Sequence, residues 1–286
     1  MAITKIDSHF YRGERAARDV SSYVAVNALL TPAHFVFAGA AAAREGLGSQ
    51  VAYRLALDYF VAGVVDYYSG ASDSVETRQG EPSDNSAPDE SDGVAVGVLH
   101  DAFRSANASV YSFGHKLAAG GRMSASLLGL VIDSGRLAAG RTGIGSVYLY
   151  RDGGLMPFFE SSEEAQQIGD AAEFADADAA RKLSFIGANS LVDVEVASVE
   201  LKGGDTICAF SRPLTQLNET LLIEALESPH FGNKSGALTT PTINLAGELC
   251  KEIFTEPDTL SYAMITQLGP DTIYCSRLAA SSLQVQ

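Results

Sequence analysis

The sequence Ser211-Arg212-Pro213 places a cation at the junction of an expected strand and an expected helix. The preceding residues, Thr206 to Phe210, are mostly apolar and predict a short strand. Pro213 can occupy the first position of a helix. After it, apolar residues recur at helical spacing, at Leu214, Leu217, Leu221, Leu222, Ala225 and Leu226. Enzymes often place a functional residue at such a corner, so Arg212 is the first candidate for an active-site residue.

Other combinations of reactive residues give weaker signals. The five histidines are scattered, and no cysteine or serine motif completes a nucleophilic set with them. Gly143-Ile144-Gly145 lies in an expected hairpin turn and not between a strand and a helix, which argues against a nucleotide-binding loop. Cys208, Cys250 and Cys275 fall in apolar or helical patterns without metal-ligand spacing. Buried free thiols are therefore expected.

Length and composition indicate one globular domain covering residues 1–286. The apolar fraction is 46% and the charged fraction 19%, and no linker divides the chain. The formal net charge of −15 makes nucleic acid and anionic membrane surfaces poor partners. No apolar run is long enough to span a membrane or to resemble a signal-peptide core. We therefore expect a cytoplasmic protein.

The first part of the chain predicts two strands followed by two helices. The strands are expected at Tyr23–Leu30 and Phe35–Ala38, and no strand is expected before them. Helical periodicity covers Ala52–Tyr67 and Leu99–Leu117. Between the helices, residues 69–93 are acidic and rich in Ser, Pro and Gly. They predict a disordered excursion.

From Ser124 onward the pattern is mainly that of strands. Short turns of the hairpin type separate four of them, which predicts antiparallel pairing. These strands are Ser124–Ile132, Arg136–Arg141, Gly145–Tyr150 and Leu155–Phe159. The later elements are an alternating strand at residues 191–199, the Thr206–Phe210 strand with its helix, a helix near Pro241–Phe254, and strands at Leu260–Leu268 and Thr272–Cys275. The expected architecture is a pair of packed sheets with helices outside.

Four local motifs, in this order, resemble the metal-dependent serine/threonine protein phosphatases of the PPM family (type 2C). Met123–Leu127 is similar to the family's Met-Gly-Thr-Thr-Leu strand entry, and Arg141–Gly153 to its hairpin ending in Tyr-Arg-Asp-Gly. Val199–Asp205 followed by Ser211–Thr215 is similar to Leu-x-x-Gly-Asp and Ser-Asp-Gly-Leu-Thr. Asp258–Ser261 is similar to the closing Asp-Asn-Ile-Thr. The resemblance implies an α+β fold, a four-layer α/β/β/α sandwich of two antiparallel sheets flanked by helix pairs.

The resemblance also implies a chemistry whose ligands are mostly missing here. The family hydrolyses phosphoserine and phosphothreonine with water activated between two Mg²⁺ or Mn²⁺ ions, which carboxylates hold. Gly39 stands where the metal-bridging aspartate belongs, and Ala40 where a backbone carbonyl ligand is usual. Arg212 replaces the aspartate of Ser-Asp-Gly, Ile144 replaces that of the hairpin, and only Asp258 is kept. We therefore expect no bound metal and no catalytic residue.

Two readings remain open for the charged residues near the lost site. Arg212 either reaches Asp258, which puts a fixed cation where a metal sat, or points to solvent while Asp258 caps a turn. In the blurred N-terminal motif, Arg15 and Asp19 either correspond to the family's phosphate-binding arginine and an acidic ligand, one residue short in spacing, or are surface charges.

The favoured hypothesis is a catalytically inactive phosphatase homologue, a pseudophosphatase that acts by binding a protein in signalling or regulation. The partner would be a phosphoprotein, a kinase or an active phosphatase, with Arg12, Arg15 and Arg18 as contacts for phosphate or peptide. The alternative is a diverged metal-dependent phosphatase whose site is rebuilt with Asp19 or Glu45. A third hypothesis is a subunit whose helices or edge strands form an oligomer.

Overall fold

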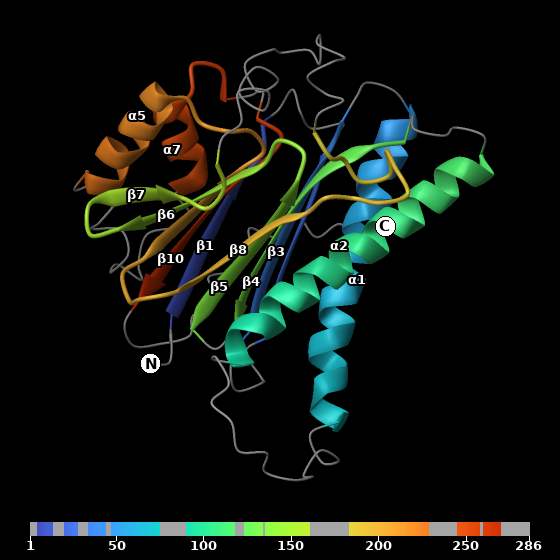
Figure 1. The fold of residues 1–286 in the computed structure, drawn as a ribbon. Helices are drawn as coiled ribbons and strands as arrows, with labels where there is room; N and C mark the ends of the chain where they lie inside the picture. Colours follow the sequence, from blue (N-terminus) through green and yellow to red (C-terminus); the bar gives the residue numbers. More distant parts are fainter. Residues whose placement is uncertain are drawn as a thin grey trace.

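The computed structural model describes residues 5–13, 20–27, 34–43, 47–74, 90–117, 123–133, 135–160, 183–228, 245–257 and 260–269. Within them, the strands form two five-stranded antiparallel sheets (Figure 1). Sheet I has the order β2 (Val20–Asn27), β3 (His34–Ala42), β4 (Ala125–Asp133), β5 (Arg136–Thr142) and β8 (Glu195–Glu200). Sheet II has the order β1 (Lys5–Tyr11), β10 (Ala263–Gly269), β9 (Thr206–Phe210), β6 (Ser146–Arg151) and β7 (Gly154–Pro157).

A pair of helices covers the outer face of each sheet. The long helices α1 (Leu47–Ser74) and α2 (Glu90–Lys116) lie on sheet I. The shorter α5 (Gln216–Glu227) and α7 (Leu245–Ile253) lie on the far side of sheet II, next to β6 and β7 in Figure 1. One apolar core fills each of the three spaces between these four layers. The predicted α/β/β/α sandwich is therefore confirmed.

Strand β3 supplies side chains to two of these cores. Phe35 and Phe37 point into the layer between the sheets, whereas Val36 and Ala38 point toward the helices. This alternation follows from the two-residue period of a strand. Strand β3 is paired with β2 on one side and β4 on the other, so it lies inside sheet I.

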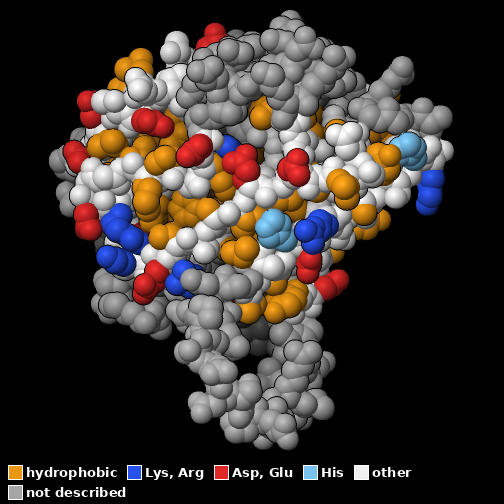
Figure 2. Space-filling model, in the orientation of Figure 1, with side chains coloured by type: hydrophobic (Ala, Val, Ile, Leu, Met, Phe, Trp, Pro, Cys, Tyr) orange, Lys and Arg blue, Asp and Glu red, His pale blue; other side chains and the backbone are white. Residues whose placement is uncertain are grey.

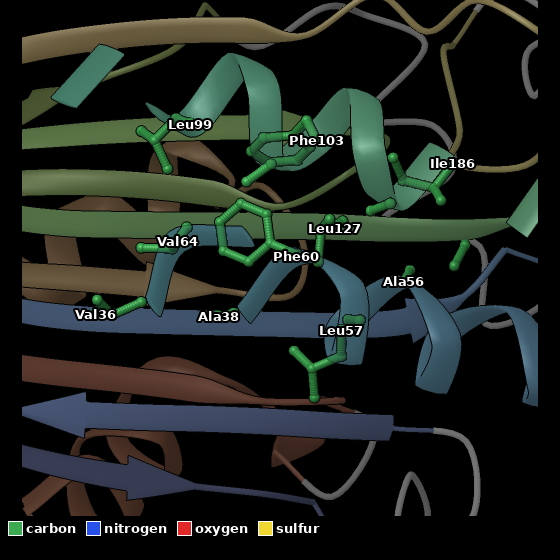
Figure 3. Packing of buried hydrophobic residues seen from close by; sticks show 14 of the residues in the cluster. Val36, Ala38, Ala56, Leu57, Phe60, Val64, Leu99, Phe103, Leu127 and Ile186 are labelled. Carbon is green, nitrogen blue, oxygen red and sulfur yellow. The ribbon is translucent and has the colours of Figure 1, made fainter. Parts of the chain in front are cut away.

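Glycines on sheet I make room for two aromatic rings of the helices. Phe60 of α1 and Phe103 of α2 meet edge to face, with ring centroids 4.9 Å apart, and Figure 3 shows both over the sheet. A Cβ atom at Gly129 would overlap the ring of Phe60, and one at Gly140 would lie 2.7 Å from a ring carbon of Phe103. The helices can approach the sheet closely because these two positions carry no side chain.

Several expected boundaries differ from the structure. Strand β1 falls in a stretch where no strand was expected, and β3 continues four residues beyond Ala38 to Ala42. Helices α1 and α2 extend into the expected disordered excursion at both ends, so that only residues 75–89 of it lie outside the described residues. The expected strand at Thr272–Cys275 also lies outside them.

Two turns have roles that their sequences do not reveal. Thr142-Gly143-Ile144-Gly145 does not close a hairpin within one sheet, because β5 belongs to sheet I and β6 to sheet II. Helix α5 begins at Gln216, three residues after Pro213, where the sequence predicted the start of the helix. Thr215 is its N-cap and forms a reciprocal capping box with Asn218, which satisfies the backbone N–H groups of both residues. No helix in the described part of the chain is long and apolar enough to cross a membrane.

Replacing Gly129 by alanine tests the packing of α1 on sheet I. We expect Gly129→Ala to lower the free energy of unfolding by about 2 kcal/mol or more, since the new methyl group overlaps the buried Phe60 ring. Gly97→Ala is the control. Gly97 is exposed on α2 with no atom near its Cβ position, so alanine should raise stability by about 0.5 to 1 kcal/mol. Urea denaturation measures both, and equal effects would contradict this packing.

Candidate functional site

Gly39 and Ala40 lie inside strand β3, where their backbone groups belong to the sheet. Gly39 pairs with Ser22 of β2 and Leu128 of β4, and this double pairing continues beyond Ala40. The Ala40 side chain is fully buried toward the helices, so Gly39 faces the space between the sheets. In a strand that is paired on both sides, the backbone carbonyl groups accept hydrogen bonds from the neighbouring strands. They are therefore not available to bind a metal ion.

The ring of Tyr262 occupies the space in front of Gly39. Tyr262 immediately precedes β10, and its side chain is buried in the core between the sheets. A Cβ atom at Gly39 would lie 2.6, 2.7 and 2.9 Å from three carbons of this ring, closer than real Cβ atoms come. Burial raises the pKa of the Tyr262 hydroxyl far above its ordinary value, so this group is neutral. A neutral ring thus fills the place toward which a carboxylate at position 39 would point.

Apolar residues also surround Ile144, at the turn between the two sheets. Ile144 packs in a small cluster around Ala43 and Phe185, both of which are buried. The turn needs glycine, because Gly143 has a φ of +81° and a Cβ there would collide with Phe185. Position 144, where the phosphatases have an aspartate, therefore carries a side chain packed on apolar neighbours, and its backbone N–H donates to the Ser126 hydroxyl at 3.4 Å.

The Ser211-Arg212-Pro213 corner is held by hydrogen bonds to two neighbouring segments, the residues before β10 and strand β6. The Ser211 Oγ accepts from the Ser261 backbone N–H at 3.0 Å, and the Ser146 hydroxyl donates to the Arg212 carbonyl at 2.7 Å. The Tyr148 hydroxyl accepts from the Leu214 N–H at 3.2 Å. The corner is therefore a fixed structural junction.

The Arg212 side chain points toward the helix side of sheet II. Its guanidinium carbon lies 4.9 Å from the centre of the Phe254 ring, which belongs to the core beneath α5 and α7. Burial raises the pKa of the nearby Cys250 thiol to about 12, and the charge of Arg212 opposes this shift. Because Gly39 faces the other side of sheet II, the structure does not bring Arg212 and Gly39 together.

Several expected site residues cannot be placed. Asp258, Arg15, Arg18, Asp19 and Glu45 lie outside the described residues, so the pairing of Arg212 with Asp258 stays a prediction. Arg12 is described and exposed, directly after β1. Its neighbour Gly13 donates its N–H to the Leu260 carbonyl at 2.9 Å, which places Arg12 at the same end of sheet II as the corner.

The described residues do not fit a two-metal centre. No group of three or more His, Cys, Asp and Glu side chains among them could hold a metal ion. More directly, the direction from which Gly39 would need to supply a bridging carboxylate is filled by the Tyr262 ring. Among the described residues, the core around this ring is apolar.

The motif residues that are kept serve the fold. Asp205 is 1% exposed and binds Arg151 through two hydrogen bonds of 2.6 and 2.8 Å, which tie β9 to β6. The same carboxylate accepts the Lys202 N–H at 2.7 Å and so shapes the turn before β9. Both residues lie in segments similar to the phosphatase motifs, so their presence explains why the fold was recognisable.

Sequence reasoning missed two residues of this region. Tyr262 directly follows the Asp258–Ser261 motif. The sequence offered one signal for it, a large aromatic residue next to the motif, together with the run of small residues from Ala38 to Ala43. Arg141 was quoted only as part of the hairpin motif. Its buried guanidinium pairs with Glu195 at 2.8 Å and donates to two carbonyl groups, those of Glu160 at 2.7 Å and Gly145 at 3.1 Å. It stabilises the turn beside Ile144.

Comparison with known proteins agrees with this architecture. The protein PppA, a key regulatory component of T6SS in Pseudomonas aeruginosa, superposes with a TM-score of 0.61 at 14% identity, over 93% of this chain and 99% of that one. The serine/threonine phosphatase PstP/Ppp of Mycobacterium tuberculosis gives 0.59 at 17% identity, over 93% and 99%. The chain has the fold of the PPM (type 2C) serine/threonine phosphatases.

At these identities the likeness concerns the fold alone. The PstP catalytic domain in complex with two manganese ions also superposes, with a TM-score of 0.57 at 17% identity, over 93% of this chain and 98% of that one. No sequence-family model matches the chain, and no curated protein matches it. The chain therefore has the type 2C fold at low sequence identity to these solved structures.

Asp205→Ala tests whether the retained motif residues are structural. We expect the free energy of unfolding to fall by about 3 kcal/mol, because the substitution leaves Arg151 and the Lys202 N–H without their buried acceptor. Lys202→Ala is the control, since that side chain is exposed in the same turn and should change stability by less than about 0.5 kcal/mol. Chemical denaturation distinguishes the two, and a harmless Asp205→Ala would contradict the structural role.

Proposed function

We propose that this chain is a catalytically inactive protein with the type 2C phosphatase fold, a pseudophosphatase that acts by binding another protein. The single observation that carries the proposal is the Tyr262 ring packed onto Gly39, in the place of a bridging carboxylate. Phosphate hydrolysis of this kind needs metal-activated water, and a buried apolar ring can neither hold a metal nor orient water. The apolar cluster around Ile144 supports the same conclusion.

The surface supports a protein partner. Large apolar side chains of the α1 and α2 pair are more than a third exposed, and two of them are tyrosines, a residue type enriched in protein interfaces. They include Tyr59 at 45%, Val65 at 37%, Tyr67 at 45%, Val94 at 41% and Phe113 at 39%. Figure 2 shows apolar side chains gathered over the middle of one face, among scattered acidic and basic ones.

Among the possible partners, we favour a phosphoprotein, because the position of Arg12 makes this hypothesis testable. Arg12 is exposed at the end of sheet II where β1, β9 and β10 meet, beside the Ser211 corner. An arginine there can bind a phosphate group through paired hydrogen bonds. A kinase or an active phosphatase remains the partner class if phosphate is not recognised.

An assay of turnover tests the loss of activity. We expect the purified chain to release no p-nitrophenol from p-nitrophenyl phosphate when Mn²⁺ or Mg²⁺ is added, because the described site offers no bridging carboxylate. The PstP catalytic domain, assayed in parallel, is the active control. Metal-dependent turnover that disappears in Asp258→Ala would overturn the proposal and establish a diverged phosphatase with a rebuilt site.

A calorimetric titration tests the phosphoprotein version. We expect a phosphoserine peptide to bind with measurable heat and its unphosphorylated form to bind at least tenfold more weakly. Arg12→Ala should weaken the phosphopeptide by about tenfold, or about 1.4 kcal/mol, through the loss of a charge-assisted hydrogen bond. Arg104→Ala, an exposed arginine on α2, is the control and should change nothing. Equal affinity for both peptides would contradict phosphate recognition.

A further inference from the structure

Tyr262 belongs to a row of residues that crosses the end of sheet II. The register aligns Ala263 of β10 with Phe210 of β9, and Phe210 with Ser146 of β6. Continuing each pairing by one residue places Tyr262, Ser211 and Gly145 side by side. The Ser211 N–H donates to the Tyr262 carbonyl at 3.0 Å, which agrees with this extension.

The Tyr262 side chain lies between two glycines, one on each sheet. Three of its ring carbons lie within 2.9 Å of the position that a Cβ of Gly39 would take on sheet I. Its hydroxyl lies 3.3 Å from the corresponding position at Gly145, at the start of β6 in sheet II. Phe37 of β3 meets the ring edge to face, with centroids 6.0 Å apart. The ring thus fills this part of the layer between the sheets and leaves no room for a side chain at position 39.

We propose that Tyr262 takes over the space of the metal-bridging carboxylate, and that Tyr262, Gly39 and Gly145 form one mutually dependent replacement. A side chain at position 39 would collide with a rigid ring held by Phe37, and a carboxylate there would also lose its water in an apolar core. A Cβ at position 145 would lie 3.3 Å from both the Tyr262 hydroxyl and the Leu128 Cβ, so a side chain there would have to press on the ring. The packing of the Tyr262 ring therefore requires glycine at position 39.

This replacement uses the same contact between Tyr262 and Gly39 that supports the proposed function, but it is tested by stability and not by turnover. A stability experiment on it gives no information on partner binding, and the turnover assay gives none on the ring. Either can therefore fail alone. The consequence is that a carboxylate at position 39 can be accommodated only after Tyr262 has become small.

A double-mutant cycle in the full chain tests the proposal. We expect Gly39→Ala to lower Tm by about 5 °C in the wild-type background and by less than about 2 °C when Tyr262→Val is also present. Tyr262→Phe keeps the ring and should leave the full effect of Gly39→Ala in place. Gly129→Ala is the matched control, because its Cβ meets Phe60 on the other face of sheet I, so its effect should be the same in both backgrounds.

Failure to fold is also informative in this cycle. If Gly39→Ala alone gives no soluble folded protein, the proposal expects Tyr262→Val to restore folding in the double variant. Tyr262→Leu keeps more apolar volume and replaces Tyr262→Val if the latter unfolds by itself. An equal loss from Gly39→Ala with and without the ring, or no rescue of folding by either smaller residue, would overturn the proposal.

Discussion

The packing of the Tyr262 ring onto the bare backbone at Gly39 is the contact on which the candidate site depends. It joins the end of sheet II to the middle of strand β3 across the layer between the sheets. An aromatic ring buries a large apolar area and needs close neighbours on both faces, and glycine gives the closest approach that a strand allows. In this place a metal centre would need several carboxylates, water and open backbone carbonyls. The two arrangements exclude each other because each requires the same volume with opposite polarity.

The residues in the segments that resemble the phosphatase motifs fall into two groups, those that stabilise the fold and those at positions where metal ligands are expected. Those that hold the fold are kept, as Asp205 and Arg151 show through a buried bidentate pair between β9 and β6. At two positions where the resemblance implies aspartates, Gly39 and Ile144, the residues are small or apolar, whereas Arg212 is charged at a third. The two cores beneath the helix pairs do not contain the Tyr262 ring, so a change at position 39 concerns only the third core, between the sheets. This division explains how four layers persist at 14–17% identity to solved phosphatases.

Local sequence patterns predicted the elements well and their sheet membership poorly. Strand Thr206–Phe210 was predicted with its observed bounds, because it is buried, apolar and flanked by clear turns. The turn at residues 142–145 was taken for a hairpin, since glycine at positive φ marks a tight turn but does not tell which sheet the next strand joins. Strand β1 was missed because Asp7, Ser8 and His9 hide the alternation of an edge strand.

The candidate site was predictable only as a set of missing ligands. Comparison with the motif shows that position 39 has no carboxylate. It does not show which residue fills the space that a carboxylate would occupy. That answer comes from a residue more than two hundred positions away, and only the packing of sheet II on sheet I brings Tyr262 opposite β3. Arg212 illustrates the same limit. Its place in the motif suggested a cation at the metal position, whereas strand alternation turns it to the Phe254 side of sheet II.

A filled site has a further physical consequence for how the chain can change. Introducing a carboxylate at Gly39 while Tyr262 is present buries a charge against carbon and costs stability before any metal can repay it. Shrinking Tyr262 first leaves a cavity between the sheets, which also costs stability. Either single step back toward a metal site is therefore unfavourable, although the two together relieve each other. The ring on Gly39 is therefore a local optimum of packing, from which a single substitution at either position lowers stability.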